Sequence, residues 1–261
     1  MARYVDTGRV GALEVLAGMV VLGLGLWMAA QAMSWWWSRD EKRTAAFAAQ
    51  AERLGMEFVA TDALHVTWEP FPLFGLGTRR EATNIVHGTW GGVEMRVFDY
   101  SFEHPSDGSS AALPTPRRRF TCAVAGIDAS CPRMVIGPTT LSSRLGEVVG
   151  ATEIRLESEA FNGRFRVECE DARFATTLVD QRMMAWLLES SAPVAFELRE
   201  DRMLCASERL SPASIPMLLQ AARGFHDRIP PVVASLYPRR PMGAEAPRSL
   251  GAGGIPPPLS R

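Results

Sequence analysis

The chain has few cysteines and no sequence motif that is typical of a catalytic or metal site. The cysteines are too few and too dispersed for a disulfide scaffold, and they lack the paired CxxC spacing of structural zinc. No HxH or HxxxH pair, GxSxG, P-loop or HExxH occurs, and Gly75-Leu76-Gly77 lacks the third glycine of a dinucleotide fingerprint. The sequence therefore predicts no cofactor and no metal, and it names no reaction. The four cysteines are Cys122, Cys131, Cys169 and Cys205.

Charge of either sign is not in excess. The 261 residues carry a formal net charge of -1, which argues against a dedicated nucleic-acid-binding protein, because such proteins usually present a strongly basic face. Beyond residue 238 the composition changes to Pro, Gly, Ala and Arg, so we expect a disordered tail over 238–261. About 190 residues remain between the first 40 and this tail, enough for one well-packed domain.

Charged side chains are also missing from one long stretch near the amino terminus, residues 15–37. About 20 apolar residues rising 1.5 Å each span the hydrocarbon core of a bilayer, so the stretch predicts a transmembrane helix after a short flank at 1–14. The stretch ends in three tryptophans, and basic residues follow it, as at a membrane–water interface. The residues expected at that interface are Trp35, Trp36, Trp37, Arg39, Lys42 and Arg43.

A secretory signal peptide is the alternative interpretation of this stretch. Ala30-Gln31-Ala32 fits an A-x-A cleavage site, and an amino terminus at Met33 would establish an exported, cleaved domain. The apolar run is longer than a typical signal core and continues into the tryptophans, which favours an uncleaved anchor. More basic residues follow the run than precede it, so we expect a single-pass protein of the cell membrane with its main domain in the cytoplasm.

The remaining chain predicts an α+β fold: a juxtamembrane helix over 38–55, then a soluble domain over 56–237. Two alternating runs flank Gly91-Gly92, a dipeptide suited to a hairpin turn, within 81–103. A second hairpin is expected from 193–206, turned by Glu200-Asp201, and amphipathic helices are expected within 171–190 and 211–229. The sheet should be mainly antiparallel, with helices packed on one face.

Asp99 is the most informative polar residue. Alternation continued from Val97 places it on the buried face of its strand, where a carboxylate needs a partner. Arg79 and Arg80 are the expected partners, in a structural ion pair or, second, in a binding role. Asn84 is expected to hydrogen-bond to backbone within the same hairpin.

Three segments together resemble an uncharacterised family of bacterial, largely actinobacterial, proteins with one membrane span and a soluble domain of unknown function. They are FPLFGLGTRREATNIVHGTWGGVEMRVFDYSF, LESEAFNGRFRVECEDARFATTLVDQRMMAWLL and LLQAARGFHDRIP. The resemblance covers most of residues 40 to 237. It implies the anchor and a single domain, and it brings no activity.

The function expected from these observations is binding or scaffolding by a membrane-tethered domain without catalytic activity. The partners expected are the lipid bilayer, through residues 15–37, and an unidentified protein; the sequence leaves the oligomeric state open. The alternative is a membrane-anchored hydrolase or redox enzyme that uses a cysteine and a histidine, for example Cys122 and His87. The basic triplet Arg117-Arg118-Arg119 is interpreted as a solvated strand entry, with contact to anionic lipid as the second interpretation.

Overall fold

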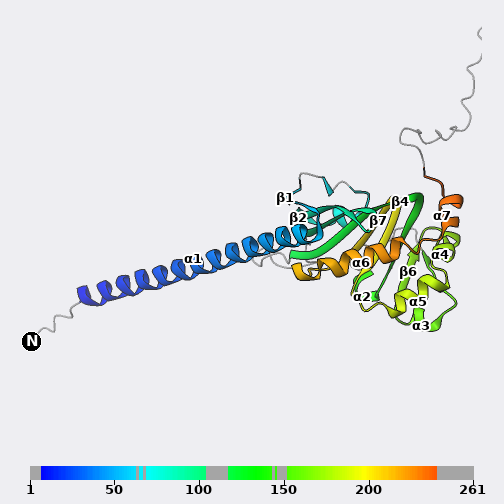
Figure 1. Ribbon diagram of the computed structural model, residues 1–261. Coiled ribbons are helices and arrows are strands. Elements are labelled where there is room, and N and C mark those ends of the chain that lie inside the picture. Colours follow the sequence, from blue (N-terminus) through cyan, green and yellow to red (C-terminus); the bar gives the residue numbers. More distant parts are fainter. Residues whose placement is uncertain are drawn as a thin grey trace, which may run out of the picture.

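The computed structural model begins with a helix, α1 (Thr7–Leu54), of 48 residues, which projects far beyond the rest of the molecule (Figure 1). The structure describes residues 7–62, 65–66, 69–103, 117–142, 145 and 152–239; within α1, the side chains of 7–16, 29–30 and 32–39 lie outside the description. The helix ends at Gly55, whose φ of +66° is readily adopted only by a residue without a Cβ. The predicted juxtamembrane helix is thus one continuous helix with the segment that precedes it.

Within the described residues, no helix has both the length and the apolar character needed to cross a membrane. The span expected at residues 15–37 falls largely on side chains outside the description, including those of Trp35, Trp36 and Trp37.

The sheet has seven strands, and every described pair is antiparallel. Its order is β1-β2-β3-β4-β6-β5, and β7 pairs with the other edge of β4. The strands are β1 (Glu57–Thr61), β2 (Thr78–Trp90), β3 (Val93–Glu103), β4 (Arg117–Gly137), β5 (Thr152–Glu153), β6 (Arg166–Cys169) and β7 (Ala195–Glu208). The antiparallel α+β fold predicted from alternation is confirmed.

The hairpin predicted around Gly91-Gly92 is formed by β2 and β3. The two glycines have φ of +57° and +89°, as a tight hairpin turn requires. Before this turn, β2 has one more residue than β3 between Thr83 and Val86, and the register of the two strands shifts there. This irregularity is a β-bulge, which redirects the side chains of β2 at that point.

Strand β4 is 21 residues long, and its two ends pair with different strands. Its first half pairs with β3 and its last residues with β6, while β7 follows it along the opposite edge. The register shifts between Gly126 and Cys131, where β4 has more residues than β7, so both strands bend. Pro132, which cannot donate a backbone hydrogen bond to a neighbouring strand, lies at a second register shift, between Cys131 and Met134.

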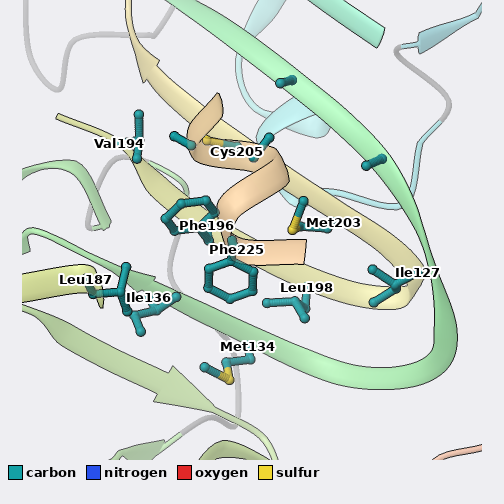
Figure 2. Close-up of a cluster of buried hydrophobic side chains, with 14 of the residues drawn as sticks. Ile127, Met134, Ile136, Leu187, Val194, Phe196, Leu198, Met203, Cys205 and Phe225 are labelled. Carbon is teal, nitrogen blue, oxygen red and sulfur yellow. The ribbon is translucent and has the colours of Figure 1, made fainter. Parts of the chain in front are cut away.

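The second predicted hairpin is wrong, because its two segments do not pair with each other: they form one strand, β7, which bends at Glu200-Asp201 and pairs with β4 on both sides of the bend (Figure 2). Glu200 has a φ of +55°, but β4 bends at the same level and remains paired on both sides of that residue. The helix expected within 171–190 is broken at Val179-Asp180, and Asp180 caps the second part by accepting a hydrogen bond from the backbone N–H of Met183.

Helices cover one face of the sheet and enclose the larger core. At the centre of this core, Phe196 of β7 stacks on Phe225, with ring centroids 4.3 Å apart (Figure 2). Buried residues of β3, β4 and β6 and the carboxy-terminal part of α1 complete it. The helices are α3 (Glu159–Asn162), α4 (Ala172–Leu178), α5 (Gln181–Glu189), α6 (Ile215–His226) and α7 (Pro231–Leu236), and a 3₁₀ turn, η3 (Pro212–Ser214), precedes α6.

The opposite face is covered mainly by the segment between β1 and β2. This segment includes η2 (Pro72–Gly75), and its Phe74 packs edge-on against Tyr100 of β3 at 4.9 Å. The short α2 (Thr139–Ser142) contributes Leu141 to the same second core. Helices therefore pack mainly on one face, as predicted, and an aromatic-rich loop closes the other.

Candidate functional site

Helix α1 is not attached to the domain by a flexible tether; its last three turns pack on the sheet. Phe47 and Ala51 have 0% and 1% exposure and belong to the larger core. The guanidinium of Arg43 lies 5.1 Å from the centre of the Phe47 ring, one helical turn away on the same side. The direction in which α1 leaves the domain is therefore fixed by packing.

Arg43 forms a bidentate ion pair with Asp99 of β3. Its Nε donates to Oδ2 at 2.5 Å and its Nη2 donates to Oδ1 at 2.6 Å. The two side chains are only 12% and 10% exposed, so little water competes with the pair. Such planar, two-point contacts are the strongest form of a carboxylate–guanidinium interaction.

Asp99 also accepts hydrogen bonds from the two strands that flank β3. Asn84 of β2 donates to Asp99 Oδ2 at 3.1 Å, and Thr121 of β4 donates to Oδ1 at 3.1 Å. Asn84 in turn accepts from the hydroxyl of Thr44 on α1 at 2.8 Å. Thr121 accepts from the backbone N–H of Leu210, just beyond β7, at 2.9 Å. We call these residues, Arg43, Thr44, Asn84, Asp99 and Thr121, the junction cluster.

The junction cluster is suited to holding elements together and not to proton transfer. Asp99 accepts four hydrogen bonds, two of them charge-assisted, so its carboxylate is fully occupied. Asn84 has a φ of +56°, a conformation that asparagine tolerates, and it sits in the bulge of β2 that redirects its side chain under α1.

Two sequence-based expectations for this cluster need correction. The partner of Asp99 is Arg43, whose side chain reaches β3 from α1, which packs on the neighbouring strands β1 and β2. Arg79 instead pairs with Glu103 at 3.2 Å, and Arg80 donates to the carbonyl oxygen of Phe74. Asn84 bonds to side chains of α1 and β3, where backbone bonds within the hairpin were expected. The burial of Asp99 on its strand is confirmed, at 7% exposure.

A groove lies beside the junction cluster, where α1 leaves the sheet. It has a volume of about 710 Å³, and its lining includes four basic residues and one acidic residue. We call it the basic groove; its charged residues are Asp40, Lys42, Arg43, Arg119 and Arg209. A second cavity of about 270 Å³ adjoins it, sharing Asp40, Arg119 and Arg209.

Arg209 is the most perturbed residue of the basic groove. Burial lowers its pKa, and the positive charges of Arg43 and Arg119 lower it further. The negative charges of Asp99 and then of Asp40 oppose this effect; Asp40 lies 3.5 Å from Arg209, but its side chain is 69% exposed, so water screens that pair. Basic side chains therefore gather around this groove, and Arg43 and Arg119 repel Arg209.

The residues predicted to lie at a membrane interface do not form one surface in the structure. Arg43 is buried in the junction cluster, and Lys42 is exposed in the basic groove. The side chains of Arg39 and of the three tryptophans lie outside the description. Sequence reasoning missed Thr44, Thr121 and Arg209; the one available signal was Arg43 four residues before Phe47, which puts both on one side of a helix.

The cysteines offer no activated nucleophile. Cys122 and Cys205 have 0% exposure, and burial raises the pKa of both thiols well above the ordinary value. Cys122 and His87 are not brought together, because β3 lies between their strands and two strand spacings amount to about 10 Å. The Nε2 atom of His87 lies instead 3.5 Å from Oε2 of Glu57. Across the described ranges, no group of three or more His, Cys, Asp or Glu residues is arranged to hold a metal ion.

Comparison with known proteins adds one structural neighbour. No family model and no curated protein sequence matches the chain. The crystal structure of the mycobacterial trehalose monomycolate transport factor A, TtfA, is similar, with a TM-score of 0.54 over 76% of this chain and 98% of that chain. The likeness is one of fold, since the sequence identity is 14%. A mycobacterial neighbour is compatible with the actinobacterial resemblance, which stays a prediction.

Proposed function

We propose that the protein is a membrane-tethered accessory factor that binds a partner in the membrane and performs no catalysis. The observation that carries the proposal is the continuity of α1, a single helix whose end is locked onto the sheet by Phe47 and by the Arg43–Asp99 pair. A domain attached in this way is held at a fixed distance and rotation relative to the anchor. A flexible tether would raise only the local concentration.

The structural neighbour supports an accessory role, since TtfA is a transport factor. We propose that the present chain serves a membrane transport process in the same non-catalytic way. The neighbour names no partner for this chain; the partner expected is an integral membrane protein. In our proposal the domain lies on the cytoplasmic side of the cell membrane.

The projecting part of α1 supports the anchor. Between residues 17 and 28 its large side chains are all apolar and are 54% to 72% exposed. They are close enough in sequence to lie on every side of the helix. A helix that is apolar on every side is stable only when lipid or protein covers it. These residues are Met19, Val20, Val21, Leu22, Leu24, Leu26, Trp27 and Met28.

The anchor is tested by placing charge in it. We expect the full chain to remain in the membrane pellet after carbonate extraction, and the double variant Leu22→Lys/Leu26→Lys to be extracted, since each lysine near the centre of a span costs about 2.5–3.5 kcal/mol of insertion. Ala49→Lys, on an exposed site of the same helix within the domain, is the matched control and should stay in the pellet. A cysteine at exposed Ser235, labelled only after lysis, would support the cytoplasmic side; extraction of the unaltered chain would contradict the anchor.

The rigid attachment is tested by changing the helical phase. Two alanines inserted after Ser38 rotate the domain by about 200° relative to the anchor, whereas seven helix-forming residues restore the phase to within about 20°. We expect cross-linking in intact membranes to recover an integral membrane protein with the unaltered chain and with the seven-residue insertion, and several-fold less with the two-residue insertion. Equal recovery with both insertions would contradict rigid presentation. Recovery of no membrane protein would contradict the accessory role.

A further inference from the structure

Basic side chains outnumber acidic ones in the lining of the basic groove. Its lining has four basic side chains against Asp40, and even with the adjoining cavity the basic residues outnumber the acidic ones by five to three. Asp99 is already committed to Arg43, and the described partner of Arg209 is the exposed Asp40. An anion in the groove would therefore relieve repulsion that the folded chain maintains.

The backbone fixes two of these arginines side by side. The N–H of Arg209, directly after β7, donates to the carbonyl oxygen of Arg119 on β4 at 3.2 Å. Two guanidinium groups that start from adjacent backbone positions offer several N–H donors to one tetrahedral anion. Leu210 and Pro212 line the same groove and give it an apolar border, and Ser211 adds a hydroxyl that does not cap the following turn.

The distance of the groove from the proposed membrane span suggests where the anion comes from. Asp40 lies three residues beyond Trp37, so about 4.5 Å of helix separates the end of the proposed span from the start of the groove. This step rests on the proposed membrane anchor. At that level the groove would face the headgroups of the bilayer and not open solution.

We propose that the basic groove is a binding site for a phosphate group, held by Arg119 and Arg209 with Lys42 at the entrance. An anionic phospholipid headgroup and free phosphate both present this chemistry, and the position of the groove favours the headgroup. Bound there, an anionic lipid contacts α1, β4 and the end of β7 together, at the point where the junction cluster joins them.

Titration of the full chain in a neutral maltoside detergent tests the site. The probes are dihexanoyl phosphatidylglycerol, dihexanoyl phosphatidylcholine as a zwitterionic control, and inorganic phosphate, with binding followed by microscale thermophoresis. We expect saturable binding of phosphatidylglycerol, an increase in Kd of about tenfold or more in Arg119→Gln/Arg209→Gln, and weaker binding as salt is raised. Arg182→Gln, whose side chain is 72% exposed on α5, is the matched control and should change Kd by less than about twofold.

Lys42→Gln provides a variant that removes a groove charge at an exposed position, and its Kd should rise severalfold even if the arginine variant loses its fold by circular dichroism. An unchanged Kd in both variants, or no saturable binding of either anion, would overturn the site. Inorganic phosphate binding as tightly as phosphatidylglycerol would overturn the headgroup as the source. Because the titration uses soluble lipid, it does not depend on the anchor: an extractable chain that still binds phosphatidylglycerol contradicts the proposed function and leaves the site standing.

Discussion

Asp99→Ala should destabilise the domain by about 3–5 kcal/mol, because it leaves the guanidinium of Arg43 charged and desolvated without a partner. The same change removes the acceptor of Asn84 and of Thr121, so the links from β3 to β2 and β4 weaken as well. The free energy of unfolding is measured by urea titration of the full chain in neutral detergent, followed by circular dichroism.

Arg79→Gln is the matched control for this prediction. Arg79 also pairs with a carboxylate, that of Glu103, but its side chain is 77% exposed, so the expected loss is below about 1 kcal/mol. A double variant, Arg43→Met/Asp99→Leu, should recover most of the stability that Asp99→Ala loses, since it leaves no buried charge unpaired. If Asp99→Ala costs no more than Arg79→Gln, the pair is not what holds α1 to the sheet.

Phe47→Ala should cost about 3–5 kcal/mol, since the ring is completely buried and its removal leaves a cavity between α1 and the sheet. The loss should be concentrated at the helix: amide hydrogens of residues 44–54 should exchange faster with deuterium, while those of β4 and β7 change less. Hydrogen exchange with mass spectrometry and urea titration of the same full-chain sample measure the two effects.

Trp27→Ala is the comparison, because it truncates a larger aromatic residue of the same helix that is 61% exposed beyond the domain. The domain should keep its stability to within about 0.5 kcal/mol in this variant. A loss for Phe47→Ala that is no larger than this would mean that α1 docks without the ring, and the fixed orientation of the anchor would lose its main support.

The sequence predicts those features of the fold that local patterns determine. Alternation around Val97 gave the burial of Asp99, and two adjacent glycines gave the turn between β2 and β3. Alternation reports which face a residue occupies, and it is independent of what packs on that face. The need for a partner at Asp99 was therefore predictable, and its identity was not.

The features that were missed depend on contacts between distant segments. Arg43 and Asp99 are 56 residues apart, and choosing between Arg43 and the nearer Arg79 or Arg80 requires knowing where the end of α1 packs on the sheet. Glu200-Asp201 resembles a turn, yet β4 bends with β7 and keeps it in one strand. The basic groove depends in the same way on Arg119 and Arg209 meeting at β4 and the end of β7; Arg119 stands out as part of the basic triplet, but Arg209 does not stand out in its own segment.

The long strand β4 imposes an order on synthesis. Thr121 is bonded to the backbone of Leu210, 89 residues later, so at about 5–20 residues per second the ribosome adds the second partner some 4–18 s after the first. During that interval one edge of β4 has no strand to pair with, and an open edge invites association with other chains. Helix α1, by contrast, is complete before β4 is begun. The nascent chain thus forms its longest helix early and pairs β4 with β7 late. Newly made copies are most vulnerable to aggregation between those two events.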